Sequence, residues 1–118
     1  TSTFIQIRHE EGDGATQLAY STAGDQGQAT GFQQMFRSLE GDNDSSICGE
    51  LYVFNPSSTT YTKHFIGQGF GQNAAPAAFT AKIAGYFNTT TALTRMRFKM
   101  STGNIDAGTI KLYGIKDS

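Results

Sequence analysis

Few residues in this chain could carry out nucleophilic or acid–base chemistry. His9 and His64 are the only histidines, and Cys48 is the only cysteine. A thiol and an imidazole form a nucleophilic pair when a fold brings them together, and both residue types bind zinc. The three residues match neither a zinc-binding spacing nor a local nucleophile motif, so only tertiary proximity could make a triad of them. We interpret His64 as a half-exposed strand residue and predict no catalytic residue.

A glycine-rich stretch, GQGFG at residues 67–71, has the composition of a loop that could hold a phosphate group. Its glycines lack the G-x-G-x-x-G spacing, and no recognisable helix follows whose N-terminus could face an anion. We therefore predict that these residues form a flexible loop and that the chain binds no cofactor.

Asp42, Asp44 and Ser46 alternate as the ligands of an EF-type calcium loop do. Such a loop requires glycine where this chain has Ile47, and a bidentate glutamate where it has Val53. Residues 41–46 are therefore predicted to form a simple turn. The sequence predicts no metal site.

Basic residues alternate with apolar ones near the end of the chain. Arg95, Arg97 and Lys99 would line one face of a strand, opposite Met96, Phe98 and Met100. We interpret this basic stripe first as the solvated side of a strand, and second as a contact for an anion or a glycan.

Length and charge limit the classes of function. The 118 residues fit one domain, and 9 Lys and Arg against 10 Asp and Glu give a formal net charge of −1 at pH 7. Such a balance gives no long-range attraction to nucleic acid or to an acidic membrane surface. One cysteine excludes an intrachain disulfide, and no apolar stretch is long enough to span a membrane.

The composition predicts an all-β fold. Thr, Gly, Phe and Tyr are frequent, whereas runs of strong helix formers are few. Alternation between turn signals predicts seven or eight short strands in a single domain, residues 1–118, folded as an antiparallel β-sandwich of jelly-roll-like or immunoglobulin-like architecture. The predicted strands lie near residues 4–8, 18–20, 32–39, 47–54, 61–66, 79–87, 96–100 and 110–115.

Two of these strands have distinctive patterns. Residues 32–39 fit a helix almost as well as a strand, and we favour the strand. Residues 47–54 and 61–66 predict a hairpin around a turn at 55–58. Because both faces of the first hairpin strand are partly apolar, we predict that it lies in the centre of a sheet.

Two stretches of the chain resemble a known group of proteins. They are LYVFNPSSTTYTKHFI, residues 51–66, and AGYFNTTTALTRMRFKMSTGNIDAGTIKLYGIKDS, residues 84–118. The chain there resembles a family of small β-rich virion proteins of tailed bacteriophages, notably those of marine bacteria and cyanobacteria. The most specific segments are 54–61 and 101–114, where Thr102 and Ala107 replace small residues usual in the family. Relatives carry further strands before the segment that matches STFIQIR, so the resemblance implies the C-terminal part of a longer chain.

The resemblance implies a structural protein on the outside of the particle, assembled in the host cytoplasm and then exposed on the virion surface. Family members serve as head decorations or knobs and as parts of tail fibres. We expect a non-enzymatic capsid decoration protein that docks on the major capsid protein, since the chain is short and has no coiled coil or repeat. A homo-oligomer is compatible with this role, whereas nucleic-acid binding and membrane insertion are not expected.

The alternative is a tail-fibre or receptor-binding module that recognises a glycan on the host surface. Its contacts would come from two segments predicted as loops, residues 13–31 and 67–76. The candidate contacts are Asp25, Gln28, Gln68, Phe70 and Asn73, with Arg95, Arg97 and Lys99 as a basic stripe.

Overall fold

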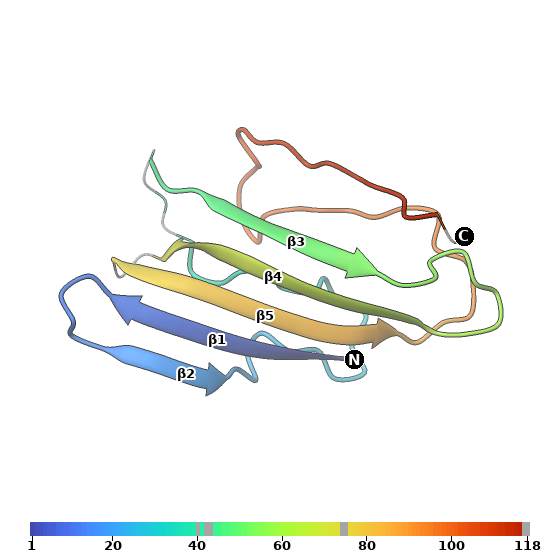
Figure 1. The fold of residues 1–118 in the computed structure, drawn as a ribbon, viewed down its shortest axis with the longest axis horizontal. Coiled ribbons are helices and arrows are strands. Elements are labelled where there is room, and N and C mark those ends of the chain that lie inside the picture. Colours follow the sequence, from blue (N-terminus) through green and yellow to red (C-terminus); the bar gives the residue numbers. More distant parts are fainter. Residues whose placement is uncertain (40, 42–43, 74–75, 117–118) are drawn as a thin grey trace.

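The computed structural model describes residues 1–39, 41, 44–73 and 76–116. These residues form one antiparallel sheet of five strands and no helix, with the strand order β2-β1-β5-β4-β3 (Figure 1). The prediction of an all-β fold is therefore confirmed. The strands are β1 Ser2–Glu10, β2 Thr16–Tyr20, β3 Ile47–Val53, β4 Lys63–Asn73 and β5 Ala77–Phe87.

The sheet is built mainly from hairpins. Consecutive strands pair in three hairpins, β1 with β2, β3 with β4 and β4 with β5. β1 also pairs along its whole length with β5, which joins the hairpins into one sheet. The predicted hairpin is confirmed, with Asn55 in the left-handed region at φ 47° and the Ser58 amide donating to the Asn55 carbonyl (3.1 Å). β3 lies at a sheet edge, so the prediction of a central strand is wrong.

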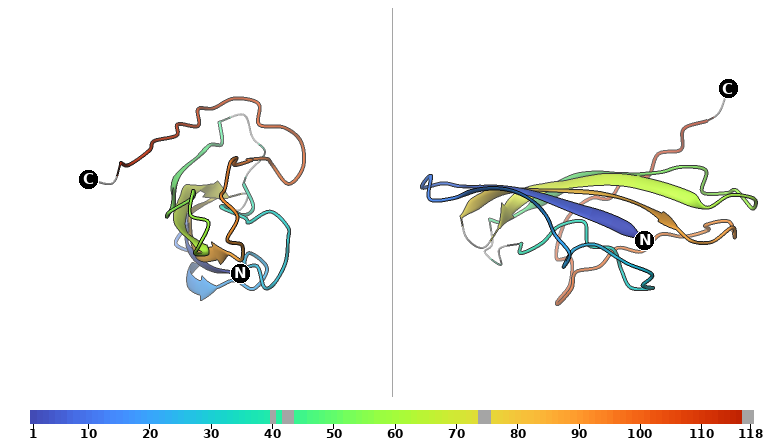
Figure 2. Two further views of the ribbon diagram at one scale, coloured as in Figure 1. Left: turned by 90° about the vertical axis from the view of Figure 1, so that its right-hand side faces the viewer. Right: turned by 90° about the horizontal axis from the view of Figure 1, so that it is seen from below.

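One face of the sheet carries the core. Five side chains there are almost completely buried: Phe4, Phe65, Phe79, Ala81 and Ile83. Residues 21–39, which we call the strap, cross this face in an irregular conformation (Figure 2). Backbone hydrogen bonds fix the strap at its start, since the Ser21 amide donates to the Phe4 carbonyl and the Ser2 amide to the Gln26 carbonyl, both at 2.8 Å.

The GQGFG stretch is part of β4, so the prediction of a flexible loop is wrong. Its three glycines face the core side of the sheet, where backbone of the strap or of residues 46–50 approaches closely. A Cβ on Gly69 would lie 2.7 Å from the Met35 carbonyl oxygen, and one on Gly71 would lie 2.8 Å from the Ser46 carbonyl oxygen. The glycines are therefore needed for close packing of backbone on backbone.

Three predicted strands are not formed. Residues 32–39 lie in the strap and are neither strand nor helix, apart from one bridge between Leu39 and Asn73. Residues 96–100 and 110–115 have no strand pairing. The described residues thus form a single sheet, and part of the predicted turn at 41–46 lies outside them.

The segment after β5 is held near the core side at its beginning. The buried Lys63 side chain donates from Nζ to the carbonyl oxygens of Thr89 (3.2 Å) and Thr91 (2.8 Å). The Leu93 amide donates to the Pro56 carbonyl (2.8 Å). These bonds fix residues 88–93 beside the start of β4.

Residues 101–116, which we call the arm, are different. Every arm residue is exposed, and no hydrogen bond joins the arm to another part of the described chain. In both figures the arm runs past the β3 edge of the sheet, and its end lies beyond the side of the sheet opposite the strap (Figures 1 and 2).

Candidate functional site

The strap covers only one face of the sheet, and we call the other the open face. Its large side chains are between 37% and 75% exposed. They come from all five strands: Ile5, Ile7, Leu18, Tyr20, Tyr52, Ile66, Phe70 and Tyr86. A soluble monomer rarely exposes so many apolar groups on one surface, because water contact with them is unfavourable.

The apolar residues of the open face gather in two clusters. On β1 and β2, Ile5 lies opposite Tyr20 and Ile7 opposite Leu18. On β3 and β4, Tyr52 lies opposite Ile66, and Phe70 lies four residues further along β4, opposite Cys48. Lys82 and Gln68 are neighbours on the central strands between these clusters. The open face therefore has two apolar areas around a polar centre.

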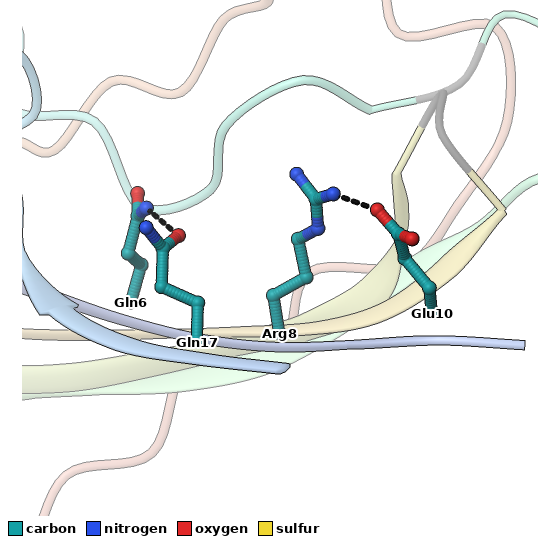
Figure 3. Close-up of polar contacts among 4 residues, drawn as sticks. All are labelled: Gln6, Arg8, Glu10 and Gln17. Carbon is teal, nitrogen blue, oxygen red and sulfur yellow. Dashed lines mark hydrogen bonds and ion pairs between the residues drawn. The ribbon is translucent and has the colours of Figure 1, made fainter. Parts of the chain in front are cut away.

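The β1–β2 hairpin has its polar side toward the strap. The side chains there are Gln6, Arg8, Glu10 and Gln17 (Figure 3). Gln6 Nε2 donates to Gln17 Oε1 at 2.7 Å, and Arg8 forms an ion pair with Glu10. Phe4, at the start of β1, is the large apolar side chain of this hairpin that reaches the core, whereas Ile5, Ile7, Leu18 and Tyr20 face away from it.

Carboxylates lie at both edges of the open face. At the β2 edge, Tyr20 donates its hydroxyl to Asp25 Oδ2 (2.5 Å), and His9 Nε2 lies 2.7 Å from Asp13 Oδ1. At the β3 edge, Glu50 accepts from the Tyr52 hydroxyl (3.1 Å) and from Gln68 Nε2 (2.7 Å).

These contacts change the acidity of two tyrosines. The hydrogen bond to Asp25 raises the pKa of Tyr20, and the hydrogen bond to Glu50 raises the pKa of Tyr52. Both shifts favour the neutral phenol, which is the form that donates a hydrogen bond. Near pH 7 both tyrosines are therefore hydrogen-bond donors and not nucleophiles.

The residues that could do chemistry are not brought together. His9 pairs with Ala78, which lies opposite Gln72 on β4, whereas His64 is at the other end of that strand, roughly 26 Å away at the usual rise. Cys48 lies on β3, three strands from His9. Among the residues that the structure describes, no group of three His, Cys, Asp or Glu could hold a metal ion.

The five candidate glycan contacts are also scattered. Asp25 lies beyond β2 in contact with Tyr20, and Gln28 is exposed in the strap. Gln68 and Phe70 lie on the open face of β4, whereas Asn73 is buried on the strap side at the end of that strand. They form no common loop surface, because residues 67–73 are strand.

The three residues of the basic stripe, Arg95, Arg97 and Lys99, do not lie on a strand. Arg97 and Lys99 both lie over the Phe32 ring, at 5.1 Å and 4.6 Å from its centre, and Arg95 is exposed. Cation–π contacts with the strap therefore hold two of these three charges.

The open face itself was not predicted from the sequence. The signal was present in residues 2–10, where Ile5 and Ile7 alternate with Gln6 and Arg8. Alternation shows that a strand has an apolar side, but it does not show which side meets the core of its own chain.

Comparisons with known proteins identify no relative of this chain. The chain matches no family model, no curated protein and no solved structure. The described residues also contain no helix that could cross a membrane. Functional inference therefore depends on the open face, the arm and the sequence resemblance.

Proposed function

We propose that this domain is a non-enzymatic structural protein on the surface of a tailed bacteriophage virion, where its open face docks on another virion protein. The observation that carries this proposal is the cluster of eight large apolar or aromatic side chains on the open face. Surfaces of this composition mark protein interfaces. The resemblance of residues 51–66 and 84–118 to virion proteins supplies the class of partner.

The size of the open face supports docking on a protein. The five strands contain 43 residues, which at a rise of about 3.3 Å and a strand spacing of about 4.8 Å present roughly 680 Å². A stable interface of standard size buries about 800 Å² on each partner. The open face therefore supplies most of the area that a specific complex needs.

Docking on this face also accounts for the expected sandwich. A β-sandwich has a second layer about 10 Å from the first, and its core lies between the two layers. In the assembled particle a partner provides that layer, so a jelly-roll-like or immunoglobulin-like arrangement is completed by association. The lack of disulfides suits assembly in a reducing cytoplasm.

Capsid docking is supported better than glycan recognition by a tail fibre. Sugar binding needs polar groups that converge on one ligand. The five candidate contacts come from the strap, the open face and the buried side of β4, and Asp25 and Gln68 are already engaged in hydrogen bonds within the chain. The open face, by contrast, has two exposed apolar areas on one side of a single sheet.

The test is the location and copy number of this chain in intact particles. We expect tens to hundreds of copies on the capsid shell, and we expect Leu18→Asp with Ile7→Asp to abolish their incorporation. Thr59→Asp, in the exposed β3–β4 connection, is the matched control and should leave incorporation unchanged. A few copies confined to the tail, or full incorporation of the open-face variant, would overturn capsid docking through this face.

A further inference from the structure

The arm consists of strand-forming residues without a strand partner. Ile110, Leu112, Tyr113 and Ile115 are 65–92% exposed, and Leu112 and Ile115 are the most exposed large apolar side chains of the described residues. No hydrogen bond of the described chain satisfies the backbone of the arm. Extended backbone with apolar side chains tends to pair with a free sheet edge, because pairing satisfies its donors and acceptors and buries its side chains.

Charge is divided unevenly between the arm side of the chain and the rest. Residues 1–87 contain four Lys and Arg against eight Asp and Glu. Residues 88–116 contain five against one. Three of the five basic residues, Arg95, Arg97 and Lys99, precede the arm, and the arm itself contributes Lys111 and Lys116 against Asp106. The two lysines of the arm are therefore the charges that can be attracted to the acidic residues 1–87 of another molecule.

The β2 edge has the pattern that the arm requires. β2 pairs only with β1, so its other edge is free among the described residues. The strand itself has no charged residue, and Leu18 at its centre is 75% exposed. An acidic residue lies near each end of β2. Asp13 precedes the strand and contacts His9, and Asp25 follows it and accepts a hydrogen bond from Tyr20.

Residues 111–116, KLYGIK, have apolar residues and one glycine between Lys111 and Lys116, and Lys111 is the base that can meet an acidic residue on the open face. Five residue steps span about 17 Å in an extended strand, close to the length of β2. An antiparallel register places Lys111 opposite Tyr20 and Tyr113 opposite Leu18. Lys111 then points to the open face beside Tyr20, whose hydroxyl donates to Asp25, whereas Lys116 points to the strap side, as Leu112 does.

The arm of each chain lies at the edge of the sheet opposite its own β2. It passes the β3 edge, and β3 and β2 are the two opposite edges (Figures 1 and 2). Four strand spacings of about 4.8 Å separate these edges. A second copy, however, can offer its β2 edge directly to the projecting arm.

We propose that residues 109–116 of one copy add as an antiparallel strand to the free β2 edge of a second copy. The contact joins two different surfaces, so it is heterologous and produces a closed ring or an open chain of copies. The added strand brings Tyr113 and Ile115 beside Leu18 and so enlarges the apolar area of the open face. The inference rests on the proposed function only in treating the chain as an assembly protein.

Disulfide trapping of the full-length chain tests the register. In a Cys48→Ser background, Leu18→Cys combined with Tyr113→Cys should give a ladder of covalent multimers under mild oxidation, because directly opposite residues meet the distance requirement of a disulfide. Leu18→Cys combined with Leu112→Cys is the matched control, since Leu112 points to the other side of the added strand, and should give markedly less product. Crosslinking within single chains would overturn exchange between copies, and equal yields from both pairs would overturn the register.

A charge exchange tests the same contact without oxidation. Lys111→Glu should weaken self-association about tenfold or less, as should Asp25→Lys, and the double variant should regain most of the loss. Sedimentation equilibrium at low and high salt is the measurement, and association should weaken as salt rises. Two losses that simply add would overturn the proposal.

The two proposals fail separately. A chain that stays monomeric in these experiments but still occupies the capsid shell would overturn arm exchange and leave the docking function. A chain that associates through the arm but is missing from particles would overturn the docking function and leave arm exchange.

Discussion

The two faces of the sheet are built from the same strands but differ in what lies over them. Ile83 on the strap side is 3% exposed, whereas Ile66 on the open face is 51% exposed, although Ile83 pairs with the residue next to Ile66. On the strap side, Met35 and Phe36 pack on the core cluster. The open face has side chains of the same kind and no comparable layer.

The difference shows that coverage, and not hydrophobicity, separates core from surface in this protein. The strap is an irregular segment, and Gly69 of β4 lets its backbone come close at Met35. Beyond Phe4, the β1–β2 hairpin presents polar side chains to the strap and apolar side chains outward (Figure 3). An apolar face that its own chain leaves exposed has the character of an interface.

The largest expected effect comes from comparing neighbouring residues on the two faces. Phe4→Ala should lower the free energy of unfolding by about 3–5 kcal/mol, because it empties a completely buried site. Ile5→Ala, on the open face, should cost less than about 1 kcal/mol in the isolated chain. Denaturant unfolding of both variants measures the contrast. Equal losses would mean that the open face is also a core in solution.

A second effect concerns the contact between strap and sheet. Gly69→Ala should destabilise the chain by about 1–3 kcal/mol, since the new methyl group would meet the Met35 carbonyl oxygen at 2.7 Å. Gly27→Ala is the control, because nothing lies within 4 Å of a Cβ there, and it should be neutral or slightly stabilising. Unfolding in denaturant distinguishes them. A stable Gly69→Ala protein would show that the strap does not lie on β4.

The sequence predicted the parts of the fold that local patterns decide. The alternation of residues 47–54 and 79–87 correctly predicted β3 and β5, and Asn55-Pro56 correctly marked the turn between β3 and β4. These signals depend only on the strand period and on turn chemistry, which short segments contain.

The errors concern relations between distant segments. Glycines at 67–71 favour a loop by local rules, and only the strap crossing above them explains why they are in a strand. Residues 96–100 and 110–115 alternate as strands do, but a strand also needs a neighbour. The open face was not predictable, because the alternation in residues 2–10 does not identify the side that the chain covers.

A third effect tests how the segment after β5 is attached to the strap side. Lys63→Met should cost about 1–2 kcal/mol, because the carbonyl oxygens of Thr89 and Thr91 lose a charged donor while the removal of a buried charge offsets part of the loss. Lys82→Met, on the open face, should change stability by less than about 0.5 kcal/mol. Amide exchange of residues 89–93 should quicken in the first variant alone. Unchanged exchange there would contradict the role of Lys63.

A smaller effect is expected where the basic stripe meets the strap. Phe32→Leu keeps apolar bulk but removes the ring face under Arg97 and Lys99, which should cost about 0.5–1 kcal/mol. Limited proteolysis should then cut faster after these two basic residues. Gln34→Leu, exposed in the same strap, is the control. If the cutting rates of the two variants agree, the ring does not hold the stripe.

The smallest expected effect is on the pKa values of two tyrosines of the open face. The hydrogen bonds to Asp25 and Glu50 raise the pKa values of Tyr20 and Tyr52. The neutral phenols are favoured in the folded state, so this contribution to stability is fully present below the unfolded pKa, near 10, and is lost as pH rises through the raised folded pKa. Titration of phenolate absorbance should therefore show two late-ionising tyrosines, and Asp25→Asn should return only Tyr20 to its ordinary range. If Asp25→Asn leaves the titration curve unchanged, the carboxylate at the β2 edge does not hold the Tyr20 hydroxyl, and the acidic end that the arm requires is not positioned at that edge.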